Sequence, residues 1–180
     1  EFSNLTQVIP IPVDLESIQM KPPTNKNKLL IFHGLSRYGF KGTKYIEQAF
    51  SDLAVKYSKK ADFLIKGKMP LNQYLDLLEM TDFIVDQSST YSLGVNGVFG
   101  LAMGKIVFGG AEPESLKCLG ITSSPVINIK PDPKVIVQKI SQILDSGDID
   151  ELRVRSRKYA EDFHCCRKVA SQYIDTWVKA

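Results

Sequence analysis

Two cationic side chains and several glycines follow the first apolar run of the sequence, and together they could bind an anion. Arg37 and Lys41 lie four residues apart in the segment HGLSRYGFKGT, residues 33–43, directly before a helical pattern. An arginine can bind a phosphate group through two parallel hydrogen bonds, a lysine adds a compact charge, and a helix begins with a partial positive charge. Gly34 and Ser36 belong to the same candidate site. We expect a diphosphate here; the alternative is that the cations are solvated and the glycines only form turns.

A hydroxyl-rich segment after the third apolar run provides a second candidate phosphate contact. It spans residues 86–94 with the sequence DQSSTYSLG and leads into a helical pattern. The first amide groups of a helix have no partner within it, so those near Ser92, Leu93 and Gly94 would face the strand ends and could bind an anion. Serine and threonine also cap helices without binding any ligand, and the sequence leaves both interpretations open.

Three other short segments carry weaker signals for ligand binding. Lys68 and Met69 follow the second apolar run and could place backbone groups and a flat apolar surface beside a nucleotide base, although a plain turn is the simpler interpretation. Glu112 and Glu114 could accept hydrogen bonds from sugar hydroxyls or remain solvated. His33 ends a strand, but no second histidine or cysteine lies at ligand spacing, so we expect a polar contact rather than a metal site. The sequence identifies no catalytic residue.

Short apolar runs, alternating with helical patterns, must position these loops. The runs are continuous, which is typical of strands that are buried on both faces of a sheet. They are Leu29–Phe32, Phe63–Ile65, Phe83–Val85, Ile106–Phe108 and Val126–Ile129. Right-handed connections between such strands give a parallel sheet that binds ligands beyond the carboxyl ends of its strands. The sequence therefore predicts an α/β, Rossmann-like domain with three layers.

The helical patterns and one irregular segment define the domain organisation. The patterns cover residues 45–57, 71–78, 95–103 and 136–144, and residues 149–179 predict one long amphipathic helix or two. An exposed apolar stripe on this last segment could contact a partner domain. Residues 1–28, rich in proline, form an irregular linker segment, and residues 29–180 form the folded domain. Because the sequence does not start with methionine, we expect a piece of a longer protein.

The composition excludes several classes of protein. With 43% hydrophobic and 24% charged residues, the chain is an ordinary globular domain, and a net charge of +3 with mixed signs argues against nucleic-acid binding. No apolar run approaches the roughly 20 residues that span a bilayer, so we expect membrane contact only through the parent protein. Cys118, Cys165 and Cys166 are expected to be reduced thiols, which indicates a cytoplasmic protein.

Taken in order, the loops resemble those of the C-terminal domain of retaining GT-B glycosyltransferases, from about residue 8 to the final helix. Residues 8–14 resemble the interdomain linker of that family, and Arg37–Gly42 resembles its basic element that contacts the donor diphosphate. Residues 74–87 resemble the stretch that leads into the donor loop. Gly94 and Phe99–Lys105 are similar to the glycine and the glutamate-led helix of that loop.

The resemblance implies a donor-binding domain for a nucleoside-diphosphate sugar, with no metal and no other cofactor. The donor would be bound by Arg37, Lys41 and the amides of residues 92–94, and its sugar would pass to an acceptor hydroxyl in polysaccharide or glycoconjugate synthesis. An N-terminal domain of the same protein would bind the acceptor. The domain alone would therefore bind the donor without turning it over.

The sequence departs from that family at two positions. The family usually carries two glutamates eight positions apart, and here these positions hold Tyr91 and Phe99. Losing the second carboxylate removes a ribose contact worth roughly 1.5–3 kcal/mol. Two interpretations follow: an active transferase whose ribose contact has moved to Asn96 or Glu112, or a degenerate module that serves as a scaffold or partner surface. A sugar-nucleotide epimerase shares the architecture but needs acid and base groups that the sequence does not identify.

Overall fold

A five-stranded parallel sheet forms the centre of the protein. The computed structural model describes residues 8–20, 27–35 and 38–179. The strands are β1 (Leu29–Leu35), β2 (Ala61–Gly67), β3 (Phe83–Val85), β4 (Ile106–Gly109) and β5 (Ile127–Asn128), and their order in the sheet is β2-β1-β3-β4-β5. Each predicted apolar run overlaps one strand, and all neighbouring strands are parallel. The predicted α/β fold class is confirmed.

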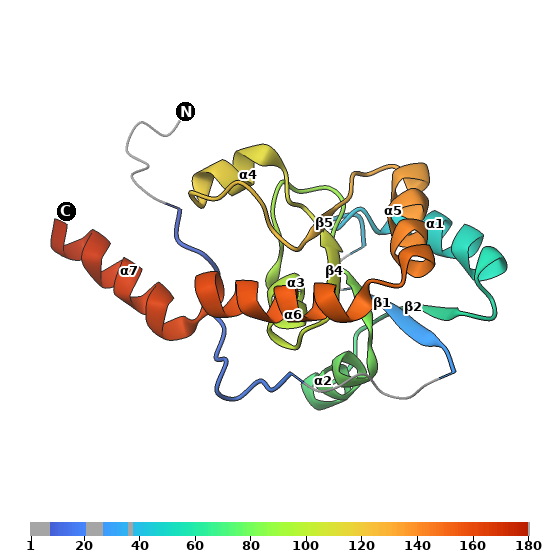
Figure 1. The fold of residues 1–180 in the computed structure, drawn as a ribbon, viewed down its shortest axis with the longest axis horizontal. Coiled ribbons are helices and arrows are strands. Elements are labelled where there is room, and N and C mark those ends of the chain that lie inside the picture. Colours follow the sequence, from blue (N-terminus) through green and yellow to red (C-terminus); the bar gives the residue numbers. More distant parts are fainter. Residues whose placement is uncertain (1–7, 21–26, 36–37, 180) are drawn as a thin grey trace.

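Helices cover both faces of this sheet. They are α1 (Thr43–Lys56), α2 (Leu71–Met80), α3 (Val95–Ala102), α4 (Pro113–Cys118), α5 (Pro133–Ser146), α6 (Ile149–Tyr159) and α7 (Cys166–Lys179), with a π-helical turn η1 (Ala160–His164) between the last two. Successive strand residues point to opposite faces. Phe83 and Val85 pack with residues of α1 and α5, whereas Ile84 packs with α2 and Val107 packs with α3 and α6. Figure 1 shows α1 and α5 side by side on their face.

The strand order places a topological switch point between β1 and β3. The chain leaves the carboxyl end of β1 through α1 and returns as β2 on one side of it, whereas β3 pairs with the other side of β1. From β3 the chain continues outward to β4 and β5. The loops after β1 and β3 therefore diverge in opposite directions, and the crevice at such a switch point is where open α/β sheets bind ligands.

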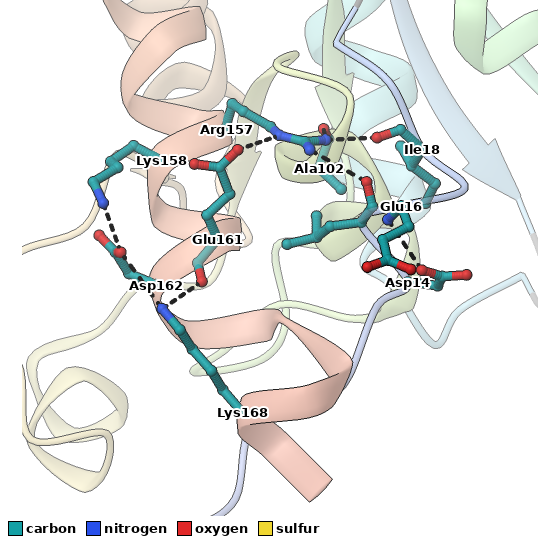
Figure 2. Close-up of polar contacts among 10 residues, drawn as sticks. Asp14, Glu16, Ile18, Ala102, Arg157, Lys158, Glu161, Asp162 and Lys168 are labelled. Carbon is teal, nitrogen blue, oxygen red and sulfur yellow. Dashed lines mark hydrogen bonds and ion pairs between the residues drawn. The ribbon is translucent and has the colours of Figure 1, made fainter. Parts of the chain in front are cut away.

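Part of the N-terminal segment, residues 8–20, is irregular, and one arginine is among the groups that hold it to the body. The guanidinium group of Arg157 donates hydrogen bonds to the main-chain oxygens of Ile18 and Ala102 at 2.6 and 2.7 Å, and its Nε donates to Glu161 at 2.8 Å (Figure 2). The planar guanidinium carries enough donors for all of these acceptors. A single side chain of α6 thus connects the N-terminal segment to the end of α3.

The amphipathic segment of residues 149–179 forms two helices with a break between them. Cys165 leaves the helical conformation with φ −57° and ψ 121°. Val13 pairs with the chain at this break: its N–H donates to the oxygen of His164 at 2.8 Å, and its oxygen accepts from the N–H of Cys166 at 3.0 Å. Beyond the break, α7 extends away from the sheet (Figure 1).

The end of α7 carries an exposed apolar stripe. Tyr173, Ile174, Trp177 and Val178 are between 41% and 80% exposed. Residues three and four positions apart share a face of a helix, so these side chains form one continuous surface. Among the described helices, none combines the length and the apolar character that crossing a bilayer requires.

Candidate functional site

A buried ion pair joins the two loops at the switch point. Lys41, in the loop after β1, donates through Nζ to Oδ1 of Asp86, the first residue after β3, at 2.9 Å. The side chain of Asp86 is fully buried and that of Lys41 is 11% exposed. The oxygen of Lys41 also accepts a hydrogen bond from the N–H of Ser88 at 3.0 Å. The loops of the two predicted phosphate contacts are therefore in direct contact.

The second oxygen of Asp86 occupies the start of α3. Its Oδ2 accepts a hydrogen bond from the N–H of Gly94, the N-terminal cap of α3, at 2.6 Å. A side chain at Gly97 would approach the same oxygen to 3.0 Å, which places the carboxylate against the first turn of the helix. A negative charge at this position is stabilised by the helix dipole. The carboxylate of Asp86 thus binds both Lys41 and the amide of Gly94, the two groups that were predicted from the sequence to bind a phosphate.

Two polar side chains pack against Gly34 in β1, beside the start of α3. A side chain at Gly34 would lie 3.0 Å from Nδ2 of Asn96 and 3.2 Å from the hydroxyl of Tyr74, so these two side chains converge on the glycine. The hydroxyl of Tyr74 is buried and has no hydrogen-bond partner among the described residues. Burial raises its pKa, with a smaller contribution from Asp86, so the hydroxyl is a neutral donor. The tyrosine hydroxyl and the asparagine amide therefore lie against Gly34 and fill the space that a side chain there would need.

A second unpaired hydroxyl lies at the start of α1. Gly42 caps this helix with φ 72°, in the left-handed region that favours glycine, and a side chain there would collide with the hydroxyl oxygen of Ser88. That oxygen is buried and has no hydrogen-bond partner among the described residues. The first turn of α1 contains no acidic residue. The start of α1 therefore remains suited to an anion, because no carboxylate occupies it.

His33 is a structural residue of the switch point. Its Nδ1 lies 2.7 Å from the oxygen of Val85, and its Nε2 lies 3.0 Å from the hydroxyl of Thr43. Because a carbonyl only accepts, Nδ1 carries the proton and Nε2 accepts from the threonine. Burial lowers the pKa of the imidazole, against a smaller raising effect of the bond to Val85, so the ring is neutral. The expected polar contact is confirmed.

Other residues of the predicted site lie away from the crevice. Tyr91, Ser92 and Leu93 line a cavity of about 390 Å³ beneath α4. Phe99 lines another cavity, of about 480 Å³, together with Met103 and part of the N-terminal segment.

The loop after β2 and part of the loop after β1 complete the predicted set. Lys68 is exposed with φ 53°, and Met69 packs partly buried beside α2. Arg37 and Ser36 lie outside the described residues.

Metal ligands do not gather in the described part of the chain. No group of three or more histidine, cysteine, aspartate or glutamate side chains there is arranged to hold a metal ion. Cys118, Cys165 and Cys166 are free thiols, as predicted. The ion pair of Asp86 and the unpaired hydroxyl of Tyr74 were not predicted from the sequence. The position of Asp86 was a usable signal, because an acid directly after a buried strand lies where such sheets bind ligands.

The comparisons with known proteins agree with the fold. No protein-family model matches the chain, and no curated protein sequence matches it. Among solved structures, HepE from Anabaena in complex with UDP and glucose superposes with a TM-score of 0.68 at 13% identity, over 94% of this chain and 56% of that one. The pneumococcal O-GlcNAc transferase GtfA, in complex with UDP and GlcNAc, superposes with a TM-score of 0.63 at 13% identity, over 93% of this chain and 37% of that one.

A glycosyltransferase from Rickettsia africae superposes with a TM-score of 0.61 at 15% identity, over 87% of this chain and 48% of that one. The chain therefore spans about half or less of the length of these three proteins. At such identities the likeness shows the fold: a Rossmann-like parallel sheet flanked by helices, as in the C-terminal domain of GT-B glycosyltransferases.

Proposed function

We propose that this chain is the donor-binding domain of a GT-B glycosyltransferase and binds a nucleoside-diphosphate sugar at the switch point between β1 and β3. The observation that carries the proposal is a pair of buried hydroxyl groups at the switch point, those of Tyr74 and Ser88, which have no hydrogen-bond partner among the described residues. The fold likeness to HepE and GtfA, both solved with UDP, supports the same ligand class. Fold alone does not fix function, so the site must carry the argument.

The residues of the crevice have complementary roles in this proposal. Asn96 carries both a donor and an acceptor, so its amide can replace the missing carboxylate at Phe99 as a contact for a ribose hydroxyl. The start of α1, with the unpaired hydroxyl of Ser88 beside it, attracts the diphosphate. Lys41 reduces the negative charge of Asp86, which would otherwise repel the ligand. Stabilising the departing diphosphate in this way favours transfer of the sugar.

The rest of the reaction belongs to a partner domain of the same protein in this proposal. That domain binds the acceptor, whose hydroxyl receives the sugar in polysaccharide or glycoconjugate synthesis in the cytoplasm. Its closure over the crevice excludes water. The exposed stripe of α7, which includes Trp177 at 73% exposure, is a surface for such a domain. The isolated chain binds the donor without turning it over, and no metal is required.

A non-catalytic module is the second candidate, and a specific observation favours it. Asp86 already occupies both Lys41 and the amide of Gly94, two of the groups that were expected to bind phosphate. Phe99, where the family resemblance would put the ribose-binding glutamate, packs against two clusters of the core. A scaffold that no longer binds nucleotides would tolerate both features.

Calorimetric titration of the chain with UDP and GDP separates the two candidates. Replacing Asn96→Leu keeps the size of the side chain and removes its amide, so we expect roughly tenfold weaker binding of the preferred nucleotide, since one such contact is worth about 1.5 kcal/mol. Asn72→Leu, an exposed position on α2, is the matched control and should bind as the unchanged chain does. Binding of neither nucleotide by the intact chain would reject the donor-binding proposal in favour of the scaffold.

A further inference from the structure

The largely apolar cavity beneath α4 is separate from the crevice at the switch point. Its volume is about 390 Å³, and its walls include Leu93, Val98, Leu116 and Val126. α4 covers it although no residue of this helix is fully buried. Gly34, Tyr74 and Asn96 at the switch point do not line this cavity. For comparison, an apolar cavity of roughly 150 Å³ binds benzene, so this one has room for a molecule of two rings.

Two buried polar side chains form part of the cavity wall. Tyr159 and His164 are 8% and 6% exposed, and both line the cavity. Nδ1 of His164 lies 2.8 Å from the oxygen of Ile11, so this nitrogen carries the proton and Nε2 presents a lone pair. Among the described residues, neither Nε2 of His164 nor the hydroxyl of Tyr159 has a hydrogen-bond partner.

The two groups are held firmly in place. The ring of Tyr159 lies 4.9 Å from that of Phe163 and 5.6 Å from that of His164, between ring centres. Burial raises the pKa of Tyr159 to about 12 and lowers the pKa of His164, so the first is a neutral donor and the second a neutral acceptor. A ligand with matching groups would form both hydrogen bonds in surroundings that hold little water, where such bonds are stronger than in bulk solvent.

We propose that the cavity beneath α4 binds a small, mainly apolar molecule that carries one hydroxyl group. The apolar part fills the space between α4 and α3, and the hydroxyl accepts from Tyr159 and donates to His164. A hydroxyl is the simplest group that does both at a single atom. Pockets of this size with apolar walls and a few convergent polar groups are typical ligand sites. The proposal does not depend on nucleotide binding, because it uses none of the residues of the crevice.

Calorimetric titration of the chain with two probes of equal shape tests the proposal. 2-Naphthol carries the hydroxyl, and 2-methylnaphthalene replaces it with a methyl group. We expect 2-naphthol to bind at one site about tenfold more tightly, because only this probe satisfies both buried groups. Equal affinity of the two probes, or no saturable binding of 2-naphthol, would overturn the proposal.

Variants assign the binding to the cavity. Tyr159→Phe removes one oxygen atom and keeps the ring contacts, and His164→Asn keeps a donor for Ile11 while it removes Nε2. Each should weaken 2-naphthol about five- to tenfold and leave 2-methylnaphthalene unchanged. Leu116→Trp fills the cavity and should abolish both, whereas Leu71→Trp on exposed α2 should change neither. Full affinity of 2-naphthol for the Tyr159 variant would contradict the assignment, even if the filled variant failed to fold.

Discussion

Replacing Asp86→Asn should destabilise the fold strongly, because it leaves Lys41 as a buried ammonium group without a counter-charge. The asparagine has the same shape, and its oxygen can still accept from the amide of Gly94. Removing one partner of a buried ion pair typically costs 3–5 kcal/mol. The lysine side chain keeps 11% exposure and so some contact with water. We therefore expect the lower end of that range, about 3 kcal/mol.

The magnitude can be measured by urea denaturation at pH 7 against a matched surface pair. Lys28 and Asp62 also form an ion pair, at 3.2 Å, but their side chains are 40% and 64% exposed. Asp62→Asn should therefore cost less than about 1 kcal/mol. A third variant, Asp86→Asn combined with Lys41→Met, removes the buried charge as well and should recover much of the loss. If Asp86→Asn costs no more than Asp62→Asn, the pair is not buried as described and the reasoning fails.

Three further predictions concern other parts of the molecule. Burial lowers the pKa of His33, so the unfolded state binds more protons and stability should fall as the pH drops below about 6.5. In urea denaturation between pH 7.5 and 5, His33→Asn should reduce this loss, and the remainder should come from His164, whose pKa is also lowered by burial. Gly110→Ala would collide with the main chain of the loop after β3 and should lower the urea midpoint more than Gly147→Ala, which has φ 78° but no atom nearby. Arg157→Met removes the hydrogen bonds to three main-chain oxygens, those of Leu15, Ile18 and Ala102, and should increase amide exchange in residues 13–18. The exposed Lys158→Met should not.

The strands and most helices could be predicted because their signals are local. The continuous apolar runs of the inner strands β3 and β4 are buried throughout, whereas those of β2 and β5 at the edges are partly exposed. In α1 the buried apolar residues recur at the three- and four-residue spacing of one helix face. α5 also begins and ends at ordinary signals: the side chain of Asp132 caps its start, Pro133 occupies its first turn and Gly147 ends it with φ 78°. Such signals do not depend on where the rest of the chain lies.

The polar contacts of the site could not be predicted, because they join residues far apart in the sequence. The partner of Lys41 is 45 positions away, and only the strand order brings β1 beside β3. In isolation Lys41 had the features of a free cation, and the loop after β3 those of a set of free amides. The unpaired hydroxyl of Tyr74 is likewise visible only after packing, since tyrosines at helical spacing usually belong to the core.

The break between α6 and α7 has a comparable origin. The helical pattern continues through residues 149–179, so the sequence left one helix or two open. Tertiary pairing decided the outcome: Val13 bonds the main chain on both sides of Cys165, which ends the helical conformation there.

The most direct test of nucleotide binding at the switch point is a titration of the isotope-labelled chain with UDP, followed by the NMR signals of single amide groups. If UDP binds at the switch point, we expect saturable shifts of the backbone amide of Gly34 and of the side-chain amide of Asn96, with little change in residues of α5. Saturable shifts confined to residues away from the crevice, or none at millimolar UDP, would contradict it.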